Sequence, residues 1–155
     1  MSVRVGTADF DVSAEMARIA GNDTDIGGVA VFVGKVRGRA DGQDLVSMTL
    51  EHYPGMTETE LERIETEAQH RFNLSASLIV HRIGTLKPGD NIVLVLACAP
   101  HRHDAFAAAG FLMDYLKTRA PFWKQETLAN GKSRWVAAKE SDDTAAAAWR
   151  SKPAD

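Results

Sequence analysis

Cysteine is nearly absent from this sequence, since Cys98 is the only one in 155 residues. That excludes a disulfide framework and a zinc site built on cysteines. The apolar runs, such as IVLVLACA, are too short to span a bilayer. The N-terminus lacks a charged start followed by a long apolar run and a small-residue cleavage site. These absences predict a cytoplasmic protein in a reducing compartment, with Cys98 as a buried structural thiol.

An excess of positive charge is also missing. Lys and Arg number 18 against 21 Asp and Glu, so bulk charge does not favour nucleic-acid binding. The signatures GxGxxG, GxxxxGK[ST], GxSxG and HExxH do not occur. An RNA-binding ferredoxin-like domain would need exposed aromatic residues on its strands, whereas the strands expected here are aliphatic. The common nucleotide-binding and hydrolase classes therefore have no support.

The length is typical of one domain, which we expect over residues 1–150, with a frayed tail over 151–155. Periodicity and turn residues predict strands near 3–5, 29–37, 45–52, 76–84, 91–99, 122–127 and 133–139. They predict helices near 13–20, 57–72 and 102–119 and a short one after Ser141. Ser13, Ser141 and Thr57, the last paired with Glu60, are the expected N-caps.

This order of elements predicts an α+β fold, with helices on one face of a mostly antiparallel sheet. It resembles a ferredoxin-like split unit with additions. The run from Asn91 to Ala99 is almost wholly apolar, which is typical of a central strand buried on both faces.

Basic residues gather at the ends of the expected elements. Lys35, Arg37 and Arg39 follow one strand, and alone they indicate no more than a solvated basic loop. Lys117 and Arg119 end the long helix, where cations complement the helix dipole. In a chain of net negative charge, their repeated placement at element ends is the most informative feature.

His101, Arg102 and His103 open the long helix, where cations are disfavoured and free backbone N–H groups attract anions. Basic side chains at that position favour an anion-binding site. No third ligand has the spacing to make the histidine pair a metal site, so no metal is predicted. His52, His70 and His81 are scattered in the sequence.

Lys117 and Lys124 flank Pro121, which turns the chain from helix to strand. In an extended segment Phe122 and Lys124 share one face, and Trp123 points to the other. The two lysines can therefore converge across the corner. A lysine beside other cations or partly desolvated has a lowered pKa and can act in acid–base or nucleophilic chemistry. Two ordinary surface lysines are the alternative.

Several segments together resemble one family, the large catalytic subunit of molybdopterin synthase. They are GKVR at Gly34–Arg37, LEHYPGM at Leu50–Met56, HRIGTLKPGD at His81–Asp90, HRHDAF at His101–Phe106, DYLKTRAPFWKQE at Asp114–Glu126 and RWVAAKES at Arg134–Ser141. The resemblance runs in order from about residue 27 to 149. It implies an α/β-hammerhead fold, an α+β core plus a small antiparallel β subdomain.

The resemblance also implies a reaction and its partners. The enzyme transfers sulfur from the C-terminal thiocarboxylate of a small ubiquitin-like subunit to cyclic pyranopterin monophosphate, forming the dithiolene of molybdopterin. Two large subunits form a homodimer, and one small subunit on each completes a heterotetramer. No cofactor and no metal are implied.

Site residues follow from the same resemblance, position by position. Lys117 is the main catalytic lysine, and Lys124 is its partner. The substrate or its phosphate is bound by Lys35, Val36, Arg37, His101, Arg102, Gln125 and Glu126, and Arg39, Met113 and Lys139 extend the site. Gln125 and Lys139 depart from the basic residue and the arginine expected there, and lysine loses bidentate phosphate binding.

We expect Arg37, His101, Arg102, Lys117 and Lys124 to converge on one cleft, which a second copy of the chain can complete. The competing interpretation is a non-catalytic dimeric module that binds a phosphorylated metabolite, since the same cations would serve it. Loss of Lys117 or Lys124 separates the two: it weakens affinity in a binding module and turnover in an enzyme.

Overall fold

The computed structural model describes residues 2–136 and 140–151 of the chain. The helices are α1 Val12–Ala20, α2 Met56–Phe72, α3 Arg102–Arg119 and α4 Glu140–Ala148, which a 3-10 turn, Trp149–Ser151, follows. The strands are β1 Val3–Gly6, β2 Gly28–Lys35, β3 Arg39–Ala40, β4 Gln43–His52, β5 Ala76–Arg82, β6 Gly84–Leu86, β7 Asn91–Ala99, β8 Phe122–Leu128 and β9 Ser133–Trp135. The α+β class predicted from the sequence is confirmed.

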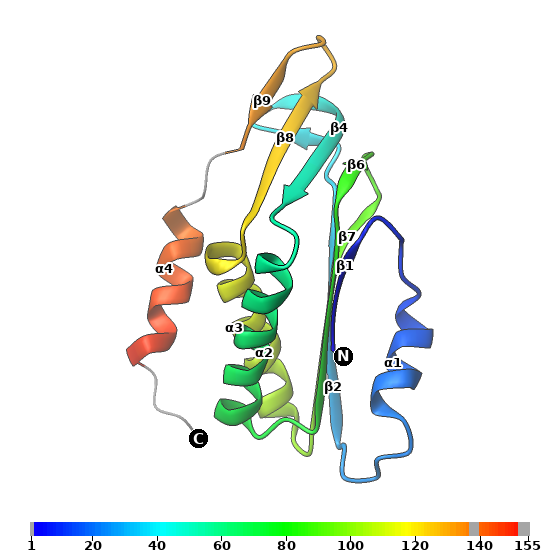
Figure 1. Cartoon of the computed structure of the whole chain (residues 1–155), viewed down its shortest axis with the longest axis vertical. Helices are drawn as coiled ribbons and strands as arrows, with labels where there is room; N and C mark the ends of the chain where they lie inside the picture. The colour runs from blue at the N-terminus through cyan, green and yellow to red at the C-terminus, as the bar shows by residue number, and fades with distance from the viewer. Residues whose placement is uncertain (1, 137–139, 152–155) are drawn as a thin grey trace.

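The first sheet has the strand order β1-β5-β7-β2, and only the β1–β5 pair is parallel. Its central strand β7 is buried on both faces, as its apolar run predicts. Val93, Val95 and Ala97 face the core shared with α2 and α3, whereas Leu94 and Leu96 pack with residues of α1. The helices therefore cover both faces of this sheet (Figure 1), and the expectation of one covered face was wrong.

A second sheet, of five strands, has the order β3-β4-β8-β9, with β6 paired to β4. It rises beyond the ends of α2 and α3 as an arm (Figure 1) and matches the small antiparallel subdomain that the resemblance implied. β4 enters α2 through residues 53–55, and β8 leaves α3 through Pro121. The arm is thus joined to the helical layer at one corner, and Lys117 and Lys124 flank that corner.

The helix caps differ from those expected. Asp11, not Ser13, caps α1 and accepts from Ala14 N at 3.0 Å. At α2, Gly55 takes the cap position, and its N–H donates to Glu58; Thr57 instead donates its hydroxyl to Tyr53 O. Helix α4 already includes Ser141. The three-residue spacing of a capping box is present at α2, but it joins Gly55 and Glu58, two residues before the expected Thr57 and Glu60.

Helix α4 packs on α3 through Trp149, which follows it. The Trp149 ring meets Phe72 and Phe111 edge-on, and its indole N–H donates to Asp114 Oδ2 at 2.7 Å. Ala146 is the residue of α4 that is buried in the core. The expected tail over 151–155 lies almost wholly outside the described residues.

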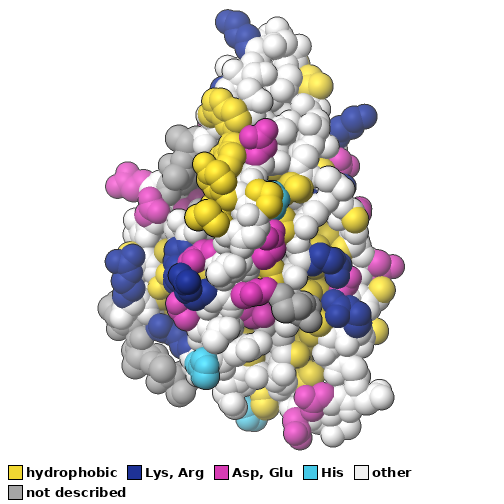
Figure 2. All heavy atoms as spheres, in the orientation of Figure 1, with side chains coloured by type: hydrophobic (Ala, Val, Ile, Leu, Met, Phe, Trp, Pro, Cys, Tyr) yellow, Lys and Arg dark blue, Asp and Glu magenta, His cyan; other side chains and the backbone are white. Residues whose placement is uncertain are grey.

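Apolar side chains also reach the surface. Figure 2 shows a row of them on one face of the molecule. Tyr53 and Met56, at the junction of β4 and α2, and Trp135 on β9 are each more than half exposed. Val31 and Phe32 on the edge strand β2, and Phe106 on α3, are exposed as well. Contiguous exposed apolar surface in a small protein is typical of interaction sites.

Candidate active site

Lys117 and Lys124 lie on either side of the corner between α3 and β8. Ala120 ends the helix in an extended conformation, φ −75° and ψ 134°, because a residue before proline is disfavoured in the helical region. In the β4–β8 pairing Lys124 lies opposite Leu50, and Phe122 lies opposite His52. Lys124 and Phe122 therefore share the inner face of the arm, as the alternation predicts, with Trp123 on the outer face.

Both lysines act electrostatically on His81, near the end of β5. His81 is 3% exposed. Burial is the main cause that lowers its pKa to about 3, a hydrogen bond with the Arg82 carbonyl opposes the shift, and the charges of Lys124, Lys117 and His52 add to it. Charges act this way only over short distances. The positive charges of the lysines that flank Pro121 therefore reach the neutral imidazole at the end of β5.

Phe122 forms the centre of this site. The His81 ring stacks on it, with centroids 3.8 Å apart and an interplanar angle of 16°. His52 approaches the same ring at 6.1 Å. His52 Nδ1 is 3.1 Å from the hydroxyl oxygen of the fully buried Thr57. These packed rings therefore lie on the same face of β8 as Lys124.

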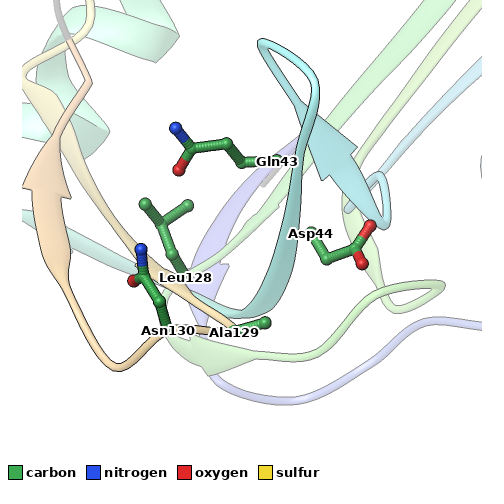
Figure 3. A pocket seen from close by; sticks show the side chains of 5 residues that line it. All are labelled: Gln43, Asp44, Leu128, Ala129 and Asn130. Atoms are coloured by element: carbon green, nitrogen blue, oxygen red, sulfur yellow. The ribbon is translucent and has the colours of Figure 1, made fainter.

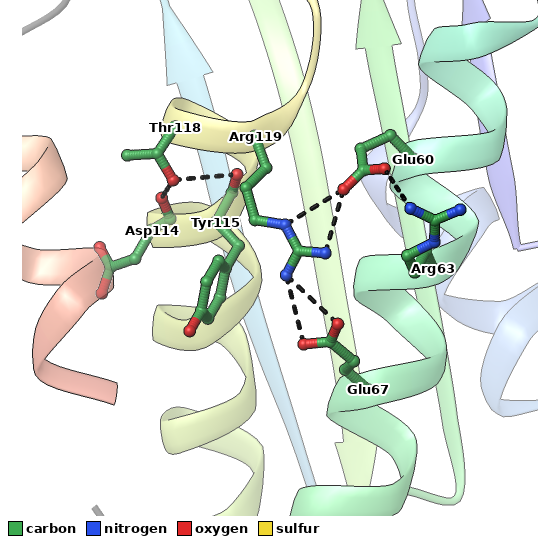
Figure 4. Close-up of polar contacts among 7 residues, drawn as sticks. All are labelled: Glu60, Arg63, Glu67, Asp114, Tyr115, Thr118 and Arg119. Carbon is green, nitrogen blue, oxygen red and sulfur yellow. Dashed lines mark hydrogen bonds and ion pairs between the residues drawn. The ribbon is translucent and has the colours of Figure 1, made fainter. Parts of the chain in front are cut away.

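The end of α3 that carries Lys117 is held to α2 by Arg119 (Figure 4). Its guanidinium donates to Glu60 Oε1 at 3.1 Å and to both oxygens of Glu67 at 3.2 and 3.3 Å. It also lies 5.1 Å from the centroid of the Tyr115 ring. Arg119 is thus engaged with carboxylates of this chain and fixes the last turn of the helix.

The basic loop after β2 has a different environment. Lys35 Nζ donates to Gly89 O at 3.2 Å, and Val36 is buried, with its N–H donating to Asp90 O. Arg37 is exposed. Arg39 pairs with Asp44 at 3.2 Å, so it is engaged within its own hairpin.

His101 and Arg102 lie at the opposite end of α3 from Lys117. Arg102 begins α3 beside Gly28, the first residue of β2. A helical rise of 1.5 Å per residue puts Arg102 and Lys117 about 22 Å apart along α3. The five cations therefore do not form one cleft within a single chain, and the prediction that they converge depends on a second copy.

The remaining expected site residues divide among several environments. Gln125 is on the outer face of the arm, paired with Thr49 and Trp135. Glu126 is buried and accepts from Arg134 Nε at 3.0 Å, so it is part of an internal ion pair. Met113 is half-buried one helical turn before Lys117. Lys139 lies outside the described residues.

Two surface pockets are lined by residues other than the two lysines. One pocket lies at the far tip of the arm (Figure 3) and is lined by Gln43, Asp44, Leu128, Ala129 and Asn130. A second is lined by Arg102, His103, Phe106 and Ala107 at the start of α3. Among the described residues, no three His, Cys, Asp or Glu side chains are grouped to hold a metal. None of the described helices has the length and apolarity to cross a membrane.

Sequence reasoning missed His52 and His81, which it treated as scattered. Their strands are far apart in sequence, and only the pairing of β4 with β8 and the end of β5 bring them to Phe122. The available signal was that each histidine lies at or next to the end of a strand. Each also lies inside a segment of the family resemblance, in LEHYPGM and HRIGTLKPGD.

Comparison with known proteins identifies the family. Residues 5–119 match the model of the MoaE protein family. A molybdopterin synthase catalytic subunit from Brucella melitensis is 49% identical over 150 residues, covering 96% of this chain and 91% of the relative. The molybdopterin biosynthesis MoaE protein from Burkholderia ambifaria has a TM-score of 0.82 at 49% identity, covering 97% of this chain and 99% of that one.

A more distant structure, the complex of subunits 1 and 2 of molybdopterin-converting factor from Helicobacter pylori, shares the fold. Its TM-score is 0.70 at 20% identity, over 90% of this chain and 92% of that one. The family match covers most of the chain, and relatives align over nearly its full length. The chain belongs to the MoaE protein family.

Proposed function

We propose that this chain is the catalytic subunit of a molybdopterin synthase that works in the cytoplasm. It transfers sulfur from the C-terminal thiocarboxylate of a small ubiquitin-like subunit to cyclic pyranopterin monophosphate. The observation that carries the proposal is the placement of Lys117 and Lys124 on either side of the corner between α3 and β8, beside the buried His81. The chain is also 49% identical to a molybdopterin synthase catalytic subunit over 96% of its length.

The chemistry suits a cationic site. The thiocarboxylate sulfur attacks a pterin side-chain carbon that carries an oxygen substituent. A C–S bond forms, the C–O bond breaks, and the oxygen leaves with its electron pair and takes up a proton. Water then adds to the acyl carbon, the acyl–sulfur bond breaks, and a carboxylate leaves while sulfur stays on the pterin. Negative charge develops on the acyl oxygen, and an ammonium placed there stabilises it. Lys117, on a helix end fixed by Arg119, has the restricted reach that this role needs.

The partners follow from the same proposal. Relatives are named catalytic subunits, which implies a second kind of subunit, and the Helicobacter pylori structure is a complex of two. We place the small subunit's C-terminus at the two lysines and the substrate phosphate at cations of the basic set.

A homodimer completes the site in this proposal, and with two small subunits it makes a heterotetramer. His101 and Arg102 are about 22 Å from Lys117 in one chain, so a second copy has to bring its own pair. The exposed Val31, Phe32 and Phe106 supply apolar surface for that contact. Phe106 lies beside Arg102 in a surface pocket, so this contact would carry Arg102 with it.

The test is conversion of cyclic pyranopterin monophosphate by the purified chain with thiocarboxylated small subunit. We expect Lys117→Ala to lose about 100-fold or more in turnover while the small subunit still binds. Lys124→Ala should be severely impaired, and Lys132→Ala, in an exposed turn, should be unchanged. Near wild-type turnover by Lys117→Ala would leave the phosphometabolite-binding module as the better interpretation.

The shared site has its own test. Lys117→Ala and Arg102→Ala homodimers are mixed under conditions that exchange subunits. If each site takes Lys117 from one copy and Arg102 from the other, heterodimers hold one intact site. Random exchange should then restore about a quarter of wild-type turnover. No recovery after proven exchange would show that both residues act within one chain or that one of them is dispensable.

A further inference from the structure

Two histidines flank Phe122 beside the lysine pair, and neither has been assigned a role. His81 stacks on the ring, and His52 lies opposite Phe122 in the β4–β8 pairing. Phe122 shares the inner face of β8 with Lys124. Through their contacts with Phe122, both imidazoles lie beside β8, the strand that carries Lys124.

Hydrogen bonds determine which ring nitrogen of His81 carries the proton. Its Nδ1 is 2.8 Å from Arg82 O, and a carbonyl oxygen only accepts, so Nδ1 bears the hydrogen. Burial keeps the ring neutral, with its pKa lowered to about 3. The lone pair is therefore on Nε2, which is the one ring atom left to accept a hydrogen bond.

The charged groups that act on His81 are few. The charges that lower its pKa are those of Lys124, Lys117 and His52, in that order. The carboxylate of Glu58 lies 3.7 Å from His52 Nδ1. A protonated His81 would add a third positive charge beside two ammonium groups. A neutral imidazole instead offers an acceptor without repelling them.

We propose that His81 is a positioning residue, whose Nε2 lone pair accepts a hydrogen bond from the Lys124 ammonium in the working site. The inference rests on the proposed function for its effect on turnover, but not for its effect on Lys124. The stack on Phe122 and the bond to Arg82 O hold the imidazole so that Nε2 has one direction. The acceptor keeps Lys124 charged and oriented for the developing oxyanion.

Three substitutions separate this role from a structural one. His81→Asn keeps a donor where Nδ1 lies but has no group at the Nε2 position. His81→Gln keeps an acceptor near Nε2. His81→Phe keeps the ring stack and loses both nitrogens. We expect turnover to fall about tenfold or more in the Asn and Phe variants and to recover in Gln, because misplaced catalytic groups lose rate steeply. His70→Phe, on the exposed side of α2, is the control.

The pH profile provides a second readout. A hydrogen bond to the ammonium favours its charged form, so losing the acceptor lowers the pKa of Lys124. The alkaline limb of turnover should move to lower pH in the Asn and Phe variants. A merely structural loss would scale the whole profile and leave that limb in place.

The Lys124 pKa can also be measured by NMR titration of the lysine side chains, without substrate or partner. We expect it to fall in His81→Phe and His81→Asn, and an unchanged value in both would overturn the proposal. In the wild-type chain, imidazole ¹⁵N shifts must show the Nδ1–H form of His81, whatever the stability of the variants. An Nε2–H form would also overturn it. Absence of molybdopterin formation by the wild type, with these results as expected, would refute the proposed function alone.

Discussion

Arg119 provides a quantitative test of how the catalytic end of α3 is held. Exposed ion pairs contribute up to about 1 kcal/mol each, and a guanidinium against a ring roughly 0.5–1 kcal/mol. Arg119 contacts two carboxylates and one ring, and its side chain is 31% exposed, which weakens each term by solvent screening. We therefore expect Arg119→Met to lower the free energy of unfolding by about 1.5–2.5 kcal/mol.

The matched control is Arg63→Met. Arg63 also pairs with Glu60, at 3.1 Å, but within α2 and at 61% exposure. Such a pair contributes about 0.2–0.5 kcal/mol. Urea unfolding followed by circular dichroism measures both variants at low salt and at 1 M salt, where screening should reduce the ionic part of the Arg119 effect. Equal costs for the two variants would refute the inference that Arg119 joins α3 to α2.

Two further predictions concern the fold around the site. Because the folded pKa of His81 is about 3 and the unfolded value is 6.5, the unfolded chain binds more protons between those values. Stability should therefore fall with acidification by up to about 1.4 kcal/mol per pH unit from this residue. Urea unfolding at pH 7 and pH 5 should show that His81→Phe loses this part of the dependence, and an unchanged dependence would contradict the buried neutral imidazole. Gly27→Ala should lower the melting temperature and cost about 1–3 kcal/mol or more, because its added Cβ would lie 2.0 Å from Pro100 O; a wild-type melting temperature would contradict that close approach.

The sequence predicted best those elements whose boundaries are chemically marked. β7 and α3 have the predicted bounds. An unbroken apolar run that ends at Pro100 marks β7, and Pro100 and Pro121 mark the two ends of α3. β3 and β6 were missed because strands of two and three residues have no measurable periodicity. Their place is determined by pairing with β4, a long-range contact.

The placement of α1 was predictable from the apolar run of β7, which is buried on both faces. A strand buried on both faces needs a cover on each face. Leu94 and Leu96 of β7 face away from α2 and α3, and α1 is the one remaining helix before the arm. The expected one-sided layer conflicted with the buried central strand predicted from the same run of residues.

For the site, local geometry was predictable and long-range geometry was not, with one exception. The placement of Lys117 and Lys124 on either side of the turn at Pro121 was predictable, because they lie only seven positions apart in the sequence. His81 comes from a different strand, and nothing local to it indicates a lysine nearby. The exception is α3 itself: an 18-residue helix is about 27 Å long. Residues at its two ends cannot meet around one small substrate within the chain. The prediction of a 102–119 helix and that of a single cleft containing Arg102 and Lys117 are therefore compatible only if two copies share the site, which the subunit-mixing experiment tests directly.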